Sequence, residues 1–351
     1  MKVRGNDVLL PTTIVGAYPR PIFMEGKVFG EGVHAPEFPS YRMRELYRHA
    51  VALAVKDMTD AGLDIVTDGA QHYESETDYE YAEIFHFFEN RLDGVAPYGD
   101  RTQVADFDLP IYRPTVLGPV AWKRPVMKPV VEAVRAATDK PFKMNVSLGP
   151  ASLAALAMDR HYGDLKALSM DMAKAYNAEL KDLDNRGGVD IVQITEPLTL
   201  FEPQPWIIEA INTAFEGVQT KRLVHICYGH EEGQPGTYEL QAHKLFPWIF
   251  DVDCDLIHLE MASHDFAETE ALRGWPKDKD LLVGVIDIKD MRVEKPATIA
   301  NWLRKTLDVV PAEQLGVATD CAMASVRRVI AKRKLRSIVE GTEIVRKELT
   351  G

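Results

Sequence analysis

The chain has 351 residues, 46% hydrophobic and 27% charged, a balance typical of a globular protein, and no apolar run approaches the roughly 20 residues that span a bilayer. Its net charge of −12 opposes attraction to phosphate backbones, so neither nucleic acid nor a membrane is an expected partner. The amino terminus shows no secretion signal, which predicts a cytoplasmic protein, and three cysteines are too few for a disulfide framework.

Short apolar, β-branched runs alternate with amphipathic stretches along the chain. Eight runs predict strands, at residues 13–18, 63–68, 140–146, 189–195, 222–228, 255–261, 281–289 and 316–320. Helices are predicted between them, most clearly at 41–62, 164–187 and 296–310, where Pro or Gly marks an end. Alternating strands and helices favour a parallel sheet, so eight units predict an α/β protein with a (β/α)8 TIM barrel. An open doubly wound sheet is the alternative.

Residues 71–126 interrupt this alternation between the second and third predicted strands. The segment is rich in Tyr and Phe and contains a predicted helix at 79–92 and a predicted extended run at 113–122. It is longer than an ordinary crossover, so we expect an insertion near the barrel mouth, within a single domain of residues 1–351. The insertion would cover part of the mouth, meet another subunit of a homo-oligomer, or only add stability.

Metal-ligating side chains occupy the carboxyl ends of three predicted strands, where the active site of such a barrel lies. His225 and Cys227 stand two residues apart, which places both on one face of a strand. Glu260 lies near the end of the sixth strand and Cys321 at the end of the eighth. Any one of these could be a packed core residue, but a buried carboxylate without a partner is costly. The set suits one zinc ion, whereas Cys254 is given no role.

Six stretches resemble, in order and spacing, the C-terminal catalytic barrel of cobalamin-independent methionine synthase and its short single-barrel relatives. They are PTTIVGAYPRP, GLDIVTDGAQ, VDIVQITEP, VHICYGH, IHLEMASHD and LGVATDCAMA, and they cover nearly the whole chain. The four zinc-ligand positions of that family match His225, Cys227, Glu260 and Cys321. The resemblance implies a zinc ion that lowers the pKa of a substrate thiol and presents the thiolate to an alkyl electrophile.

The positions that depart from the synthases concern the identity of the thiol. The resemblance implies a serine, a glutamate and an aspartate around homocysteine, where this chain has Ala17, Ala70 and Thr195. Because both acidic partners of an ammonium group are lost, homocysteine is disfavoured. Lys289 stands where the synthases carry a histidine, and with Arg20 it would suit an anionic thiol. A surface position for either cation is the simpler alternative.

The Asp-Ile-Lys ending at Lys289 resembles the epoxyalkane:coenzyme M transferases, a branch of the same superfamily. This implies a lyase in which coenzyme M, as thiol co-substrate, opens a small epoxide. The alkoxide needs a proton, for which His72 and Tyr73 are the candidate catalytic donors, and Glu196 is expected to be a structural or orienting carboxylate at the substrate site. Two alternatives are a methyltransferase that moves a methyl group from a folate or corrinoid donor to a thiol, and a catalytically silent metal-binding protein.

Overall fold

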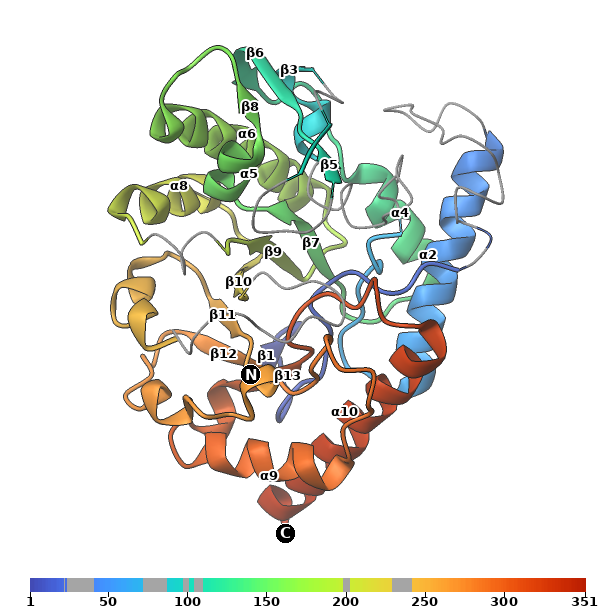
Figure 1. The fold of residues 1–351 in the computed structure, drawn as a ribbon. Coiled ribbons are helices and arrows are strands. Elements are labelled where there is room, and N and C mark those ends of the chain that lie inside the picture. Colours follow the sequence, from blue (N-terminus) through green and yellow to red (C-terminus); the bar gives the residue numbers. More distant parts are fainter. Residues whose placement is uncertain are drawn as a thin grey trace.

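A parallel sheet forms the centre of the mixed α/β fold (Figure 1). The structure is a computed structural model and describes residues 1–21, 23, 41–71, 87–96, 101–103, 110–197, 203–228 and 242–351. The sheet has six strands in the order β13, β12, β11, β10, β9, β7. They are β7 (Lys143–Leu148), β9 (Ile191–Thr195), β10 (Lys221–Ile226), β11 (Leu256–Leu259), β12 (Asp280–Gly284) and β13 (Leu315–Ala318). Each overlaps one of the predicted strands.

Helices lie around the outside of the sheet (Figure 1). They are α2 (Tyr41–Ala61), α4 (Lys128–Ala137), α5 (Pro150–Leu156), α6 (Leu165–Arg186), α8 (Pro205–Phe215), α9 (Pro296–Leu307) and α10 (Arg328–Thr350). Short 3-10 helices are η2 (Glu89–Arg91), η3 (Ala242–Leu245), η4 (Trp248–Asp251), η5 (Ala262–His264), η6 (Thr269–Leu272) and η7 (Ala312–Gln314). The helices predicted at 41–62, 164–187 and 296–310 correspond to α2, α6 and α9. In α6, the Asp164 side chain accepts a hydrogen bond from the Ala167 N–H at 3.0 Å, and Gly187, with φ +68°, ends the helix.

The first two predicted strands, at 13–18 and 63–68, form single parallel bridges instead of regular strands. Thr12, the residue just before the first segment, bridges to β13, and Val66 of the second segment bridges to the residue just before β7. The Ile65 N–H donates to the Thr12 carbonyl at 3.0 Å. These two segments therefore join the edge strands β13 and β7 of the sheet.

Side chains explain why these segments do not form longer ladders. The Thr12 N–H donates to the Asp64 carboxylate at 2.8 Å, and the Val15 N–H donates to Thr319 Oγ1 at 3.1 Å. Backbone groups that a regular strand would pair with a neighbouring backbone are thus satisfied by side chains.

An apolar cluster, here called the basal cluster, fills the inner face at the amino ends of the strands. It begins with the antiparallel pair β1 (Lys2–Val3) and β2 (Asn6–Asp7). Its members are no more than 6% exposed, and they are Met1, Val3, Ile65, Ile191, Leu223, Leu256 and Leu282. Burying these side chains stabilises the fold at the end of the sheet opposite the predicted site.

The segment 71–126 adds small sheets beside α6 (Figure 1). Its described strands are β3 (Asp93–Ala96), β4 (Arg101–Gln103), β5 (Pro110–Tyr112) and β6 (Thr115–Ala121). The predicted extended run at 113–122 contains β6, which pairs with β3 and with β8 (Met158–Asp159). The predicted helix at 79–92 lies mostly outside the described residues, and its end forms η2. The Trp122 indole N–H donates to Glu179 at 2.7 Å and so fastens the segment to α6.

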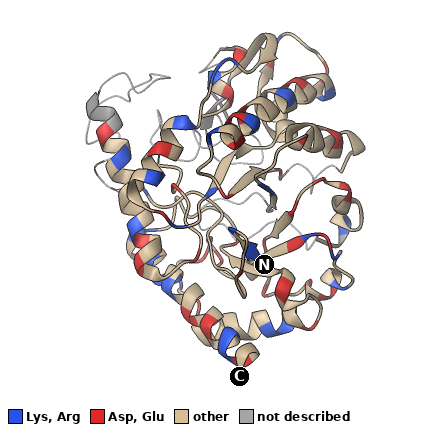
Figure 2. Ribbon diagram, turned by 180° about the vertical axis from the view of Figure 1, so that it is seen from behind, with Lys and Arg blue, Asp and Glu red and all other residues tan. Residues whose placement is uncertain are grey.

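Positive and negative residues are interspersed over the outer helices of the described chain (Figure 2). The basic run RRVIAKRKLR lies at the start of α10, where Arg328 and Lys332 both pair with Asp57 of α2, at 2.7 and 3.0 Å. Lys334 pairs with Glu294 at 2.9 Å. Several charges of this run thus bind α10 to its neighbours. Among the described helices, none has the length and apolar character needed to cross a membrane.

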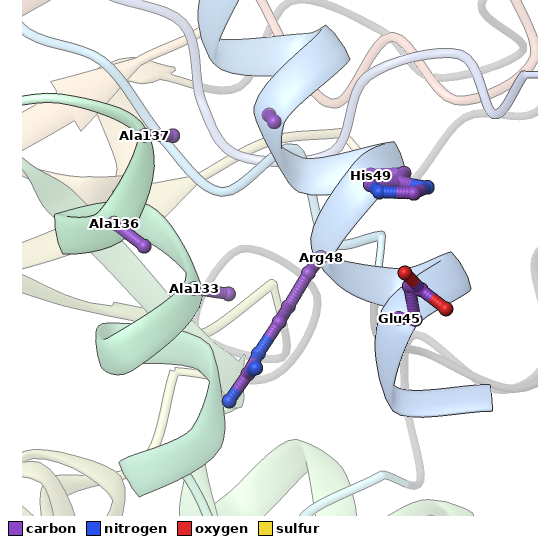
Figure 3. A pocket seen from close by; sticks show the side chains of 7 residues that line it. Glu45, Arg48, His49, Ala133, Ala136 and Ala137 are labelled. Atoms are coloured by element: carbon purple, nitrogen blue, oxygen red, sulfur yellow. The ribbon is translucent and has the colours of Figure 1, made fainter. Parts of the chain in front are cut away.

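A groove of about 510 Å³ lies on the outer surface between α2 and α4. In Figure 3, Arg48 extends from α2 towards the alanines of α4. No residue of the predicted site lines it.

Candidate metal centre

Three of the four predicted ligands lie together at the carboxyl ends of β10 and β13. The ligand atoms of His225, Cys227 and Cys321 all lie within 4.8 Å of one another, the only such group among the described residues. Cys321 Sγ is 3.6 Å from His225 Nε2. Neighbouring ligand atoms in a tetrahedral zinc site with nitrogen and sulfur donors are roughly 3.3–3.8 Å apart. The donor types and the spacing of Cys321 and His225 therefore fit a zinc ion.

A second histidine holds the imidazole of His225. His258 is opposite His225 in the register of β10 and β11, and the two Nδ1 atoms are 2.5 Å apart. Burial lowers the pKa of His225 well below its usual value, and His258 and Lys143 lower it further. Burial also lowers the pKa of His258, to about 3. Both rings are therefore neutral at pH 7, the form in which imidazole binds metal ions.

Glu260, the fourth predicted ligand, lies outside the 4.8 Å group in the described structure. Its carboxylate accepts hydrogen bonds from the Tyr228 N–H at 3.1 Å and from the Ser263 hydroxyl at 2.6 Å. It also pairs with the Nζ of Lys289, and both side chains are almost fully buried. Tyr228 directly follows Cys227, so its hydrogen bond holds the Glu260 carboxylate beside the end of β10. Lys289 thus contacts a predicted ligand directly.

The segment that carries Cys321 is tied to the segment after Glu260. The Asp320 carboxylate accepts hydrogen bonds from the consecutive N–H groups of residues 261–263, at 3.1, 2.9 and 2.7 Å. Burial, followed by the charge of Glu260, raises the pKa of Asp320 well above its usual value. These bonds fix the relative positions of the two segments that carry the predicted ligands Cys321 and Glu260.

The residues predicted to select the thiol border the same strand ends. Thr195 ends β9 and lies in register with His225. Ala17 is buried, and its carbonyl accepts a 2.9 Å hydrogen bond from the loop that follows Cys321. Ala70 is buried and has a left-handed backbone, with φ +52°. None of the three carries a charge that could pair with an ammonium group.

Glu196 has a structural place at the start of α5. The N–H groups of Ala151 and Ser152 donate to its carboxylate at 3.2 and 3.1 Å, and the Ser152 hydroxyl does so as well. A Cβ at Gly149 would lie 2.3 Å from Glu196 Oε2, so glycine is required there. A carboxylate at a helix amino terminus is favourably placed, which agrees with a structural or orienting role.

The remaining predicted residues are less informative. Arg20 follows the first predicted strand and is half-buried. His72 and Tyr73, the candidate proton donors, lie outside the described residues.

Two polar residues that were not predicted from the sequence, Ser263 and His264, lie beside Glu260. The Ser263 hydroxyl lies between the Glu260 carboxylate and His264 Nδ1, which is 3.0 Å from it. Both belong to the stretch IHLEMASHD, but only the turn of η5 brings them back towards Glu260.

A buried lysine, also missed from sequence, lies on the inner face of the sheet. The Nζ of Lys143, in β7, donates to the Val15 carbonyl and to Gln193 Oε1. Burial lowers the pKa of Lys143 to about 7, although the charge of Asp68 opposes the shift. Its positive charge in turn lowers the pKa of His225. Buried polar side chains, Lys143 and Gln193 among them, thus lie in the interior, and Lys143 influences the pKa of His225.

These features define an α/β protein with a candidate zinc site at the carboxyl ends of parallel strands. The family model described as "Cobalamin-independent synthase, Catalytic domain" matches residues 10–343. The chain therefore belongs to the cobalamin-independent methionine synthase family, as its motifs predict.

Individual relatives carry two different names. The chain is 31% identical to a 2-hydroxypropyl-CoM lyase of Xanthobacter autotrophicus, over 99% of this chain and 98% of that protein. It is 32% identical to a methionine synthase of Saccharolobus solfataricus, over 97% and 96%. A solved B12-independent methionine synthase of a Shewanella species, in complex with selenomethionine, has a TM-score of 0.84 and 30% identity, covering 98% of this chain and 99% of that one. Family and relatives together indicate an enzyme that acts on a thiol.

Proposed function

We propose that this chain is a zinc-dependent thiol alkyltransferase that adds the thiolate of coenzyme M to a small epoxide and so forms a hydroxyalkyl thioether. The observation that supports this proposal most is the charge of the side chains around the candidate metal centre: acidic groups are replaced by uncharged ones, and a cation is present. Ala17, Ala70 and Thr195 offer no acidic partner for an ammonium group, whereas the buried cation of Lys289 lies against Glu260. These charges suit a thiol that carries a negative group and no ammonium group.

We further propose that the bridges at Thr12 and Val66 complete an eight-membered ring of parallel segments, a (β/α)8 barrel. Support comes from the hydrogen bonds that join β13 to β7 through these two segments. In such a barrel the candidate metal centre would lie at the mouth, and residues 71–126 would form an insertion near it.

His225, Cys227 and Cys321 would hold the zinc ion, with Glu260 as fourth ligand. Zinc bound by such donors lowers the pKa of a thiol and supplies a thiolate nucleophile at neutral pH. For Glu260 to bind as well, its carboxylate would have to share its charge between the ion and Lys289. Asp320 keeps the loops of Cys321 and Glu260 in place through its three amide contacts.

The remaining residues would bind the thiol's tail and handle the proton. Lys289, and Arg20 if it turns towards the strand ends, would attract the sulfonate group of coenzyme M, which is 2-mercaptoethanesulfonate. In the reaction the sulfur–carbon bond forms as the carbon–oxygen bond of the epoxide breaks. The oxygen stays bonded to its other carbon, so no group leaves. The thiol proton is lost on binding, and the alkoxide gains one proton. His72 and Tyr73 are the proposed donors of that proton.

The second candidate function is methyl transfer to a thiol. It is supported by the 32% identity to a methionine synthase and by the likeness to the selenomethionine-bound structure. Homocysteine as the acceptor would, however, place its ammonium group against Ala17 and Ala70, which cannot replace its hydration. The residues at the site therefore favour epoxide opening.

The test is a paired assay of the zinc-loaded protein. Epoxypropane should be consumed only when coenzyme M is supplied, and Cys321→Ser should abolish the reaction whereas Cys254→Ser should not. Formation of methionine from homocysteine and a methyl donor, without epoxide consumption, would overturn the proposal in favour of methyl transfer.

A further inference from the structure

We propose that His258 is a positioning residue that fixes the tautomer of His225, so that Nε2 of His225 presents its lone pair to the metal ion. The inference rests on the zinc assignment made above, not on the choice of substrates. It extends the site to a side chain that would not itself bind the ion.

The geometry of the pair limits where protons can be. With the Nδ1 atoms of His225 and His258 only 2.5 Å apart, two lone pairs would repel and two N–H groups would collide. One proton therefore lies between the rings. The other ring nitrogen of His225, Nε2, points to Cys321 Sγ at 3.6 Å.

A metal ligand needs a lone pair on the coordinating nitrogen. If His225 binds through Nε2, its own proton must be on Nδ1, and it must donate that proton to an acceptor. His258 supplies the acceptor through its Nδ1 and keeps its own proton on Nε2. Both rings are buried, so water cannot take over this role. Removing His258 would leave the His225 N–H without its partner and release the ring from its orientation.

The place of His258 in the fold makes it suited to this task. It stands two residues before Glu260, so the two side chains share the inner face of the β11 segment. It also lies opposite His225 in the strand register. His258 thus contacts one proposed ligand, His225, and lies on the same face as another, Glu260, and its contact with His225 depends on pairing of β10 with β11.

Two variants separate positioning from packing. His258→Asn keeps an acceptor oxygen near the place of Nδ1, whereas His258→Leu keeps much of the volume without an acceptor. Zinc affinity, measured by competition with a chelator, should fall roughly 10–100-fold in His258→Leu and stay near that of the unchanged protein in His258→Asn. Cys254→Ser serves as a buried control. Equal zinc affinity in His258→Leu and the unchanged protein would overturn the proposal, as would equal losses in both variants.

Nitrogen NMR of the unchanged protein gives an answer even if a variant fails to fold. With 15N-labelled histidine, His225 should show a protonated Nδ1 and His258 an unprotonated Nδ1, in the zinc-loaded and the metal-free protein. A proton on Nε2 of His225 would refute the inference. Because neither readout uses coenzyme M or an epoxide, failure of the epoxide assay would not be confused with failure of this inference.

Discussion

The amino and carboxyl ends of strands β10 and β11 carry side chains of different kinds. At their amino ends, Leu223 and Leu256 belong to the basal cluster. Two residues further along each segment lie the paired histidines, and two residues beyond those lie Cys227 and Glu260. Since alternate residues share a face, one column of side chains passes from apolar residues through the histidines to proposed metal ligands over roughly 13 Å. Stability and chemistry are therefore separated along single strands, and changes at the two ends should have different consequences.

The largest expected effect concerns zinc binding. Cys227→Ser or Cys321→Ser should weaken zinc binding by more than the roughly 10–100-fold typical of losing a partner of a ligand, because a thiolate donor itself is removed. Cys254→Ser is the matched control: Cys254 is buried away from the group, and burial raises its pKa to about 12. Chelator competition measures all three. A similar loss of zinc affinity in Cys254→Ser would contradict the assignment of zinc binding to the carboxyl ends of the strands.

At the opposite end, Leu256→Ala should destabilise the fold without altering the site. Leu256 is fully buried in the basal cluster, so its truncation should cost about 2–5 kcal/mol of unfolding free energy. Urea unfolding of the metal-free protein measures the cost, and zinc titration of the folded variant should give an unchanged affinity. A clear loss of zinc affinity would show that the two ends are coupled.

On a neighbouring part of the sheet, Lys143, the first residue of β7, should make the free energy of unfolding depend on pH. Burial lowers its pKa from 10.5 to about 7, so within this window the unfolded chain binds more protons than the folded one. The unfolding free energy should therefore gain up to about 1.4 kcal/mol per pH unit from this group as pH rises from 7 to 10. Lys143→Met should lack this contribution. Unfolding free energies that vary identically with pH in both proteins would contradict it.

The smallest expected effect concerns the anionic tail of the thiol. Lys289→Met should weaken binding of coenzyme M about tenfold more than binding of uncharged mercaptoethanol, because one buried charged contact is lost. Comparing two thiols cancels any effect on Glu260. Lys279→Met is the control, since Lys279 is as buried as Lys289 but bonds to the carbonyls of Val252 and Cys254. Calorimetry of both thiols measures the ratio, and an unchanged ratio in Lys289→Met would remove this residue from the anion site.

Much of the fold could be predicted because β-branched runs and helix caps are local signals. The six strands of the parallel sheet and the helix bounded by Asp164 and Gly187 follow such signals. The segments 13–18 and 63–68 carry the same apolar pattern but form only bridges, because Asp64 and Thr319 bind backbone groups from elsewhere in the chain. Such contacts between distant residues are not visible in local composition.

The candidate metal centre could be predicted in part for the same reason. The spacing of His225 and Cys227 and the position of Cys321 are local, and the structure brings these three together. The contact of His258 with His225 depends on the register between neighbouring strands, although its spacing from Glu260 was a usable signal. The pairing of Lys289 with Glu260 required the fold itself.

The most direct test of the central claim is the proton released when the thiol binds. At pH 7 a free thiol with an ordinary pKa near 8.5 is almost entirely protonated. Calorimetry of coenzyme M binding to the zinc-loaded protein, in buffers of different ionisation heat, should show release of close to one proton, and Cys321→Ser should show none. Tight binding without proton release would contradict the account, because the thiol would then remain protonated at the site.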